Sequence, residues 1–145
     1  APAPAPVASF DISISRVRIV KNSARDGKGE IMLTGYADGT SAVVPGMGSY
    51  ITLFTNWGWR VMNKYVTSVA VAQDSTVSVP LMAEALLSIT GGMRMGACQD
   101  LKYMDLKAGS RTEAQILTIE CIDARSNGNR ENVFVLEVEF VAFEK

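Results

Sequence analysis

Apolar and polar residues alternate at a period of two over most of the chain, and this alternation constrains the fold more than any other feature. It runs from Phe10 to Ile14, after which the apolar parity switches to Val17 and Ile19. Alternation of this kind is typical of strands with one buried face. The switch of parity predicts either a bulge near Ser15-Arg16 or two short strands that pair with different neighbours.

The same alternation returns between clusters of turn residues along the rest of the chain. Asp26-Gly27 and Asn127-Gly128 are typical of tight turns, and the second pair predicts a hairpin between the last two strands. Residues 37–49 contain three glycines and one proline and are predicted to form a long loop. Strands are predicted at residues 30–37, at 50–73 as one bent strand or two divided at Gly58, and at 76–79, 113–124 and 132–143. Residues 93–106 show no clear period.

One segment favours a helix. Residues 80–89, PLMAEALLSI, contain strong helix formers, with Pro80 suited to a first turn, Ser78 to a cap, and Gly91-Gly92 to a stop. A buried strand remains the alternative. Many short strands with little helix predict an all-β, mainly antiparallel fold, either a β-sandwich or a jelly-roll-like barrel, with one short helix near 80–90.

The chain divides into an arm and a domain. Residues 1–9, APAPAPVAS, are expected to stay extended because proline fixes its own φ and restricts the residue before it. Residues 10–145 suit one β-sandwich domain. The start is also typical of the new N-terminus left by removal of a signal peptide, which predicts an extracellular or virion-associated protein. A trimmed or processed intracellular chain is the alternative.

The two cysteines are compatible with two states. Cys98 and Cys121 would form a disulfide in an exported chain. In a reducing compartment they would be two buried thiols.

The charge distribution argues against two classes of partner. The chain has 14 Lys and Arg against 15 Asp and Glu, a net charge of −1, without a run of like charges. Direct nucleic-acid binding is therefore not expected. No apolar run approaches the roughly 18 residues of a membrane-spanning helix, so an integral membrane protein of the helical type is not expected either.

The chain has no histidine, which argues against an enzyme. This absence removes the common catalytic relays and the usual zinc and haem ligands, and we expect no cofactor. Glu137 and Glu139 alternate with apolar residues and are interpreted as a solvated strand face rather than a catalytic pair.

No motif identifies a metal or phosphate site. The segment that begins at Asp123 fails the EF-hand pattern at its third and twelfth positions. A calcium site built from separate loops, with Asp26, Asp38 or Asp74 as ligands, remains the alternative. The glycine-rich residues 91–96 lack the strand-to-helix context of a phosphate loop.

The segment TNWGWR, residues 55–60, holds both tryptophans. In a straight strand, Trp57 and Trp59 share a face with aliphatic residues and would fill the core. If Gly58 reverses the phase, one indole turns outward beside Asn56 and Arg60, as a platform for a sugar ring or a protein side chain.

The last strand is apolar on both faces, which predicts a contact with a neighbouring subunit. Its second face carries Val133, Val135, Val141 and Phe143 around the two glutamates. Cover by the predicted helix or by the 37–49 loop is the alternative. These features favour a non-enzymatic structural subunit that forms homo-oligomers in an extracellular filament, surface layer or virion. The alternative is a secreted carbohydrate- or protein-binding module that uses TNWGWR.

Overall fold

The computed structural model describes residues 7–22, 28–44, 51–54, 58–89, 93–94, 98–122 and 133–145. Within the strands it leaves undescribed the side chains of residues 21–22, 28–30, 53–54, 86–89, 93–94, 121–122 and 133–134. The sequence predictions for the arm segment 1–6, for the Asp26-Gly27 turn and for the hairpin and EF-hand comparison at residues 123–132 therefore lie outside the described residues.

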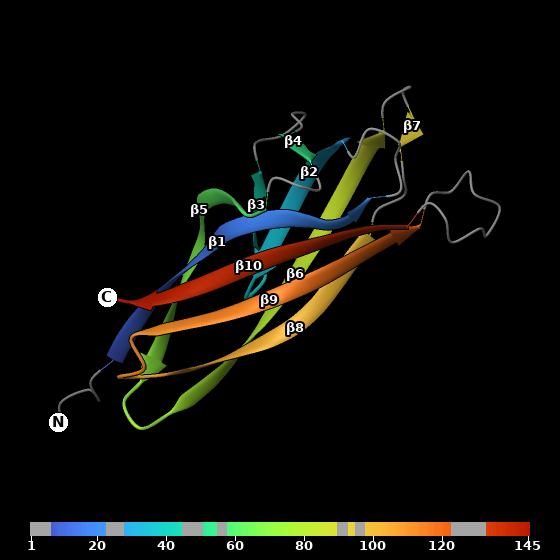
Figure 1. Ribbon diagram of the computed structural model, residues 1–145. Helices are drawn as coiled ribbons and strands as arrows, with labels where there is room; N and C mark the ends of the chain where they lie inside the picture. Colours follow the sequence, from blue (N-terminus) through green and yellow to red (C-terminus); the bar gives the residue numbers. More distant parts are fainter. Residues whose placement is uncertain are drawn as a thin grey trace, which may run out of the picture.

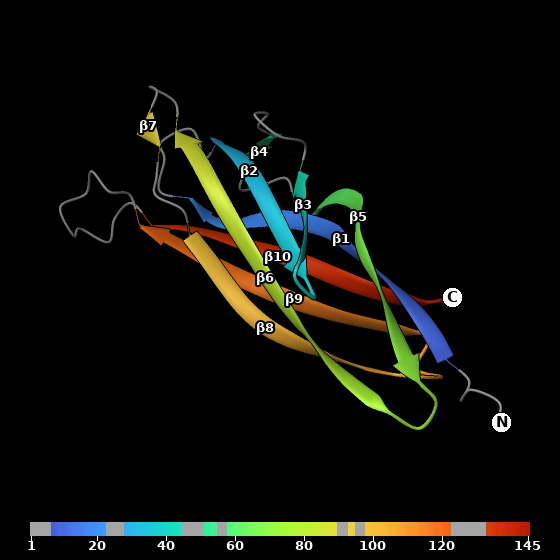
Figure 2. The ribbon, with the colours of Figure 1, turned by 180° about the vertical axis from the view of Figure 1, so that it is seen from behind.

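Two antiparallel sheets pack face to face, as Figures 1 and 2 show from opposite sides. Sheet A has the order β5 (Arg60–Ala72), β1 (Val7–Asn22), β10 (Val133–Glu144) and β9 (Thr112–Ile122). Sheet B has the order β3 (Thr40–Val44), β2 (Lys28–Ala37), β6 (Thr76–Ile89) and β7 (Met93–Arg94), with β4 (Ile51–Phe54) beside β2 and β8 (Cys98–Lys107) beside β6. The all-β sandwich predicted from the alternation is confirmed.

The parity switch in β1 is a bulge. The register shifts between Ile14 and Arg16 in the ladder with β10 and also in the ladder with β5. Because the shift adds a residue, Ile14 on one side and Val17 on the other both face inward and are fully buried. The predicted bulge near Ser15-Arg16 is confirmed.

The core lies between the sheets, and at some positions it combines large side chains from sheet A with small ones from sheet B. Phe10, Ile14 and Phe140 of sheet A are fully buried. Opposite them, β2 and β6 contribute Gly35 and Ala83, which are also buried. This pairing of large with small residues lets the two sheets approach closely.

The predicted helix at residues 80–89 is wrong, because these residues belong to β6. Leu81, Ala83 and Ala85 are each fully buried, which is a period of two. Strand pairing with β2 on one side and β8 on the other outweighs the helix propensity of leucine and alanine. Proline has no amide N–H to donate to a ladder, but Pro80 is accommodated in β6 because the ladder with β2 ends at Leu81. Beyond Leu81, the Pro80 carbonyl accepts a hydrogen bond from the Asp38 amide at 3.1 Å.

The predicted loop at residues 37–49 is wrong in its first half. Ala37 pairs with Thr40 across a two-residue turn, so β2 and β3 form a hairpin. The turn residues Asp38 and Gly39 both have positive φ, 51° and 81°, as a type I′ turn requires. Asp-Gly is the usual sequence for that turn, and it was the signal that could have located the hairpin.

Candidate functional site

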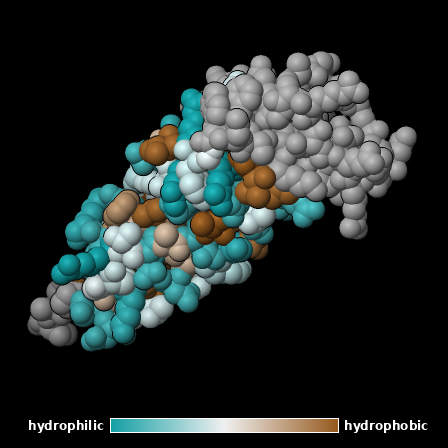
Figure 3. Space-filling model, viewed as in Figure 1, coloured by the Kyte–Doolittle hydropathy of each residue, from teal (hydrophilic) through white to brown (hydrophobic). Residues whose placement is uncertain are grey.

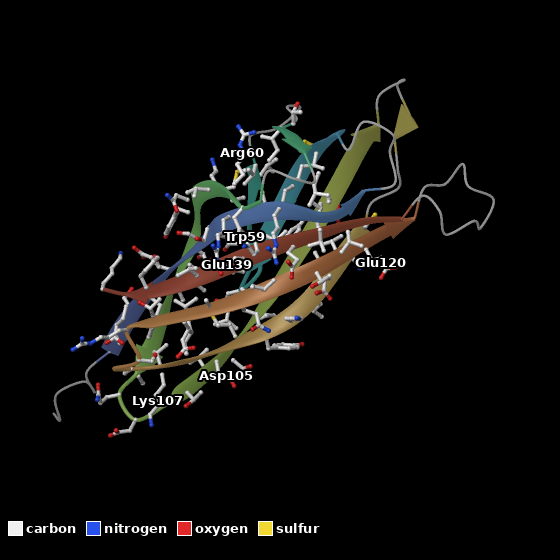
Figure 4. All side chains as sticks on the ribbon, viewed as in Figure 1. Trp59, Arg60, Asp105, Lys107, Glu120 and Glu139 are labelled. Carbon is white, nitrogen blue, oxygen red and sulfur yellow. The ribbon has the colours of Figure 1, made fainter. Side chains whose placement is uncertain are left out.

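Trp59 lies on the outer face of sheet A and not in the core. Gly58 has a φ of +70°, a left-handed conformation that breaks the strand phase before β5 begins at Arg60. The indole therefore lies against β1, with the guanidinium carbons of Arg16 and Arg18 at 4.3 and 4.4 Å from its ring centroid. The core interpretation is wrong for Trp59, whose position over the β1–β10 ladder is seen in Figure 4. Trp57 and Asn56 lie outside the described residues.

Both arginines are also paired with glutamates of β10. Arg16 donates from Nε and Nη2 to the two carboxylate oxygens of Glu139, at 3.0 and 3.1 Å. Arg18 donates from Nε to Glu137 at 2.7 Å. The two glutamates do lie on the outer face, as the alternation predicts, but they are partly buried and charge-paired.

These five side chains, Trp59, Arg16, Arg18, Glu137 and Glu139, form what we call the Trp59 cluster. Its guanidinium groups contact the indole ring and the carboxylates at the same time. The cation–π contacts and the bidentate pair of Arg16 with Glu139 hold the groups in fixed positions. The cluster therefore stabilises the β1–β10 pair and leaves less of the indole for a ligand than an isolated tryptophan would.

Arg60, the other described member of the predicted platform, points elsewhere. Its Nη1 donates to the Thr52 carbonyl of β4 at 3.0 Å, and its side chain is exposed. The structure thus separates Arg60 from the cation–π contacts of Trp59, as the two labels in Figure 4 indicate.

The predicted assembly face on β10 is only partly apolar and partly exposed. Phe143 is 54% exposed, but Val141 is only 7% exposed and Val135 is half-buried. The side chain of Val133 lies outside the described residues. Glu137 and Glu139 stand between these positions, and hydrophobic residues appear in Figure 3 as separate spots among hydrophilic ones.

A second apolar surface lies on the outer face of sheet B, where the sequence analysis made no prediction. Met82 of β6 pairs with Tyr36 of β2 on one side and with Leu101 of β8 on the other. Two residues along β6, Pro80 pairs with Tyr103. Leu101 and Tyr103 are 54% and 60% exposed, and the other three are half-buried. We call these five residues the β6 patch.

The orientation of β8 is fixed by the residues that alternate with the patch. Lys102 donates from Nζ to the Ile116 carbonyl at 2.9 Å, and the Thr118 amide donates to the Asp100 carboxylate at 3.0 Å. Both contacts reach the edge of β9 in sheet A. Since neighbouring side chains of a strand point to opposite faces, Leu101 and Tyr103 must point outward.

Asp11 belongs to a cluster of polar side chains on sheet A, away from the Trp59 cluster. The Ser68 hydroxyl donates to Asp11 at 2.6 Å, and the Lys145 ammonium lies 3.1 Å away. The hydrogen bond from Ser68, followed by the hydrogen bond and charge of Lys145, holds the pKa of Asp11 below its usual range against the opposing effect of desolvation.

This lowered pKa predicts a pH-dependent stability. The Asp11 carboxylate stabilises the fold above its unfolded pKa of about 3.9, and the stabilisation is lost as the pH falls through the folded value. We expect Asp11→Asn to have a lower Tm than the parent protein at neutral pH, and the gap to close in acid below the folded pKa. Thermal unfolding across that range measures the gap. A gap independent of pH would mean that the charge plays no part.

The other predicted sites are only partly described. Cys98 is disulfide-bonded, and the side chain of Cys121 lies outside the described residues, as does Asp26. Asp38 and Asp74 lie in separate turns with positive φ. No group of three or more His, Cys, Asp or Glu side chains that could hold a metal ion occurs among the described residues.

In the same part of the chain, no helix has the length and apolar character needed to cross a membrane.

No protein-family model matches the chain, and no curated protein matches it. Among solved structures, the chain is similar to a C2 domain protein from Ramazzottius varieornatus, with 10% sequence identity and a TM-score of 0.33. The match covers 97% of this chain and 91% of that chain. At this TM-score the likeness carries no argument, and the fold rests on the strand pairing described above.

Proposed function

We propose that this protein is a non-enzymatic structural subunit that assembles with copies of itself, in an extracellular filament, a surface layer or a virion. The observation that supports the proposal is the β6 patch. Its five apolar side chains are adjacent in the strand register of β2, β6 and β8, and two of them are more than half exposed.

The physical case rests on the apolar area that a partner would cover. Contiguous apolar patches on an outer face mark sites of association, whereas single exposed apolar residues do not. Burying such area contributes about 25 cal/mol per Å² to a contact, from which the entropy cost of association is subtracted. A net charge of −1 gives copies of the chain little reason to repel each other. The Trp59 cluster, with its charges already paired, offers a weaker argument for ligand binding.

The test is the mass in solution by light scattering over a range of concentrations. We expect the parent protein to grow beyond 15.6 kDa as its concentration rises. Leu101→Lys should prevent this growth, because it places a charge in the β6 patch. Phe143→Lys is the matched control, since Phe143 is equally exposed at 54% but lies on sheet A.

Each alternative outcome has a distinct meaning. Loss of growth in Phe143→Lys but not in Leu101→Lys would place the assembly contact on the β10 face. A parent protein that stays monomeric at every concentration would contradict self-assembly. The binding-module alternative at TNWGWR would then be the hypothesis to test, with Trp59→Ala as the first variant.

A further inference from the structure

β8 and β9 follow each other in the chain but belong to different sheets. The turn at residues 108–111 joins them, and there the Ser110 amide donates to the Lys107 carbonyl at 3.1 Å. Among the described residues, β8 forms a ladder only with β6, and β9 only with β10. Each strand therefore has an edge without a ladder on the side of the other, as Figures 1 and 2 indicate. We call the line along which these edges meet the β8–β9 seam.

Side chains of β8 connect the two edges of the seam. The Asp100 carboxylate accepts a hydrogen bond from the Leu101 amide at 2.9 Å through Oδ1, and one from the Thr118 amide at 3.0 Å through Oδ2. Lys102 donates from Nζ to the Ile116 carbonyl at 2.9 Å. The two side chains thus bind the backbone groups of β9 that an added strand would use.

The edge that these side chains cover has the sequence of an association-prone strand. Residues 114–119, AQILTI, contain no charged residue and no proline. Exposed edges with sequences of this kind pair readily with strands of other chains. Inward-pointing charged side chains at an edge are one way in which natural sheets prevent such pairing. Asp100 and Lys102 are charged and half-buried at this place, which suits them to the task.

We infer that Asp100 and Lys102 close the free edge of β9 and keep it from pairing with β9 of a second copy. An antiparallel pair centred on Leu117 would set Ile116 opposite Thr118 of the second copy and would place no charged side chain opposite another. The inference goes beyond the proposed function, because it concerns an edge of sheet A and does not depend on the β6 patch.

The test compares two full-length double variants that keep the net charge of the parent. The seam variant, Asp100→Ala with Lys102→Ala, opens the edge. The control variant, Asp105→Ala with Lys107→Ala, removes the same two charges from exposed positions of β8, which are labelled in Figure 4. At matched concentrations, light scattering should give the seam variant roughly twice the mass of the control variant or more, because a paired edge joins two copies. Equal masses would overturn the inference.

Adding Thr118→Pro to the seam variant shows whether β9 forms the contact. Proline removes the Thr118 N–H, which points to the seam and not to β10. The mass should return to that of the control variant, whereas association through the β6 patch, which lies in sheet B, should persist. A mass that stays raised would place the contact elsewhere and would also overturn the inference. The two contacts are in this way tested separately.

Asp100→Asn tests the contact with a small change of shape. Its side chain has one carbonyl oxygen in place of two carboxylate oxygens, so it cannot accept from the Leu101 and Thr118 amides in the same way. Hydrogen exchange followed by NMR should show at least one of these amides exchanging roughly tenfold faster than in the parent. Unchanged exchange at both amides would show that the carboxylate does not hold the edge, and this result stands even if the seam variant fails to fold.

Discussion

Replacing Phe140 by alanine is expected to lower the free energy of unfolding by about 3–5 kcal/mol. Phe140 is fully buried in the middle of β10, with its ring against the opposite sheet. The loss combines the transfer free energy of the ring with the cavity left behind. Because single domains of this size are stable by about 5–15 kcal/mol, the variant should lose a large fraction of its stability. Urea denaturation followed by tryptophan fluorescence measures the change.

Phe143→Ala provides the control on the same strand. Phe143 has the same side chain but is 54% exposed on the outer face, so its loss should cost about 1 kcal/mol or less. The comparison isolates burial from strand propensity. Equal losses in the two variants would mean that the inner and outer faces of β10 are wrongly assigned.

The inner face of β10 could be predicted because it depends on local information only. Alternation at a period of two assigns each side chain to a face without any knowledge of the neighbouring strands. The same is true of the bulge in β1, where the parity of the sequence itself changes between Ile14 and Val17. The sandwich followed from many such segments taken together.

Residues 80–89 show where local information fails. Leucine and alanine have high helix propensity, and they also occur in the buried positions of strands. The sequence of β6 is therefore compatible with a helix and with a strand. The choice is made by β2 and β8, which lie on either side of it. A helix at residues 80–89 does not place Pro80 and Met82 side by side on one strand face. The β6 patch was therefore not predicted from the sequence.

The Trp59 cluster depends on two things that the sequence leaves open. The sign of φ at Gly58 decides the face of Trp59, and glycine adopts either sign at little cost. The pairing of Arg16 with Glu139 joins residues 123 positions apart, and only the register of β1 against β10 brings them together. The residue types were visible in the sequence, but their proximity was not.

The two sheets approach each other closely at Gly35, and this predicts a large loss of stability when a side chain is added there. A Cβ atom at this position of β2 would lie 2.5 Å from Cδ1 and 2.9 Å from Cγ1 of Ile14, and 3.1 Å from the ring of Phe140. Those side chains are fully buried and cannot move away without disturbing the core. Gly35→Ala is therefore expected to destabilise the protein by about 1–3 kcal/mol, measured by urea denaturation.

A double-mutant cycle shows whether the loss comes from this contact. Ile14→Val removes the Cδ1 atom nearest the new methyl group and alone should cost about 0.5–1.5 kcal/mol. In combination with Gly35→Ala it should cost less than the sum of the two single losses, since the smaller side chain relieves the overlap. Simple additivity would contradict the contact with Ile14 as the cause. An unchanged stability in Gly35→Ala would show that the sheets can separate without cost, and that Gly35 does not set their spacing.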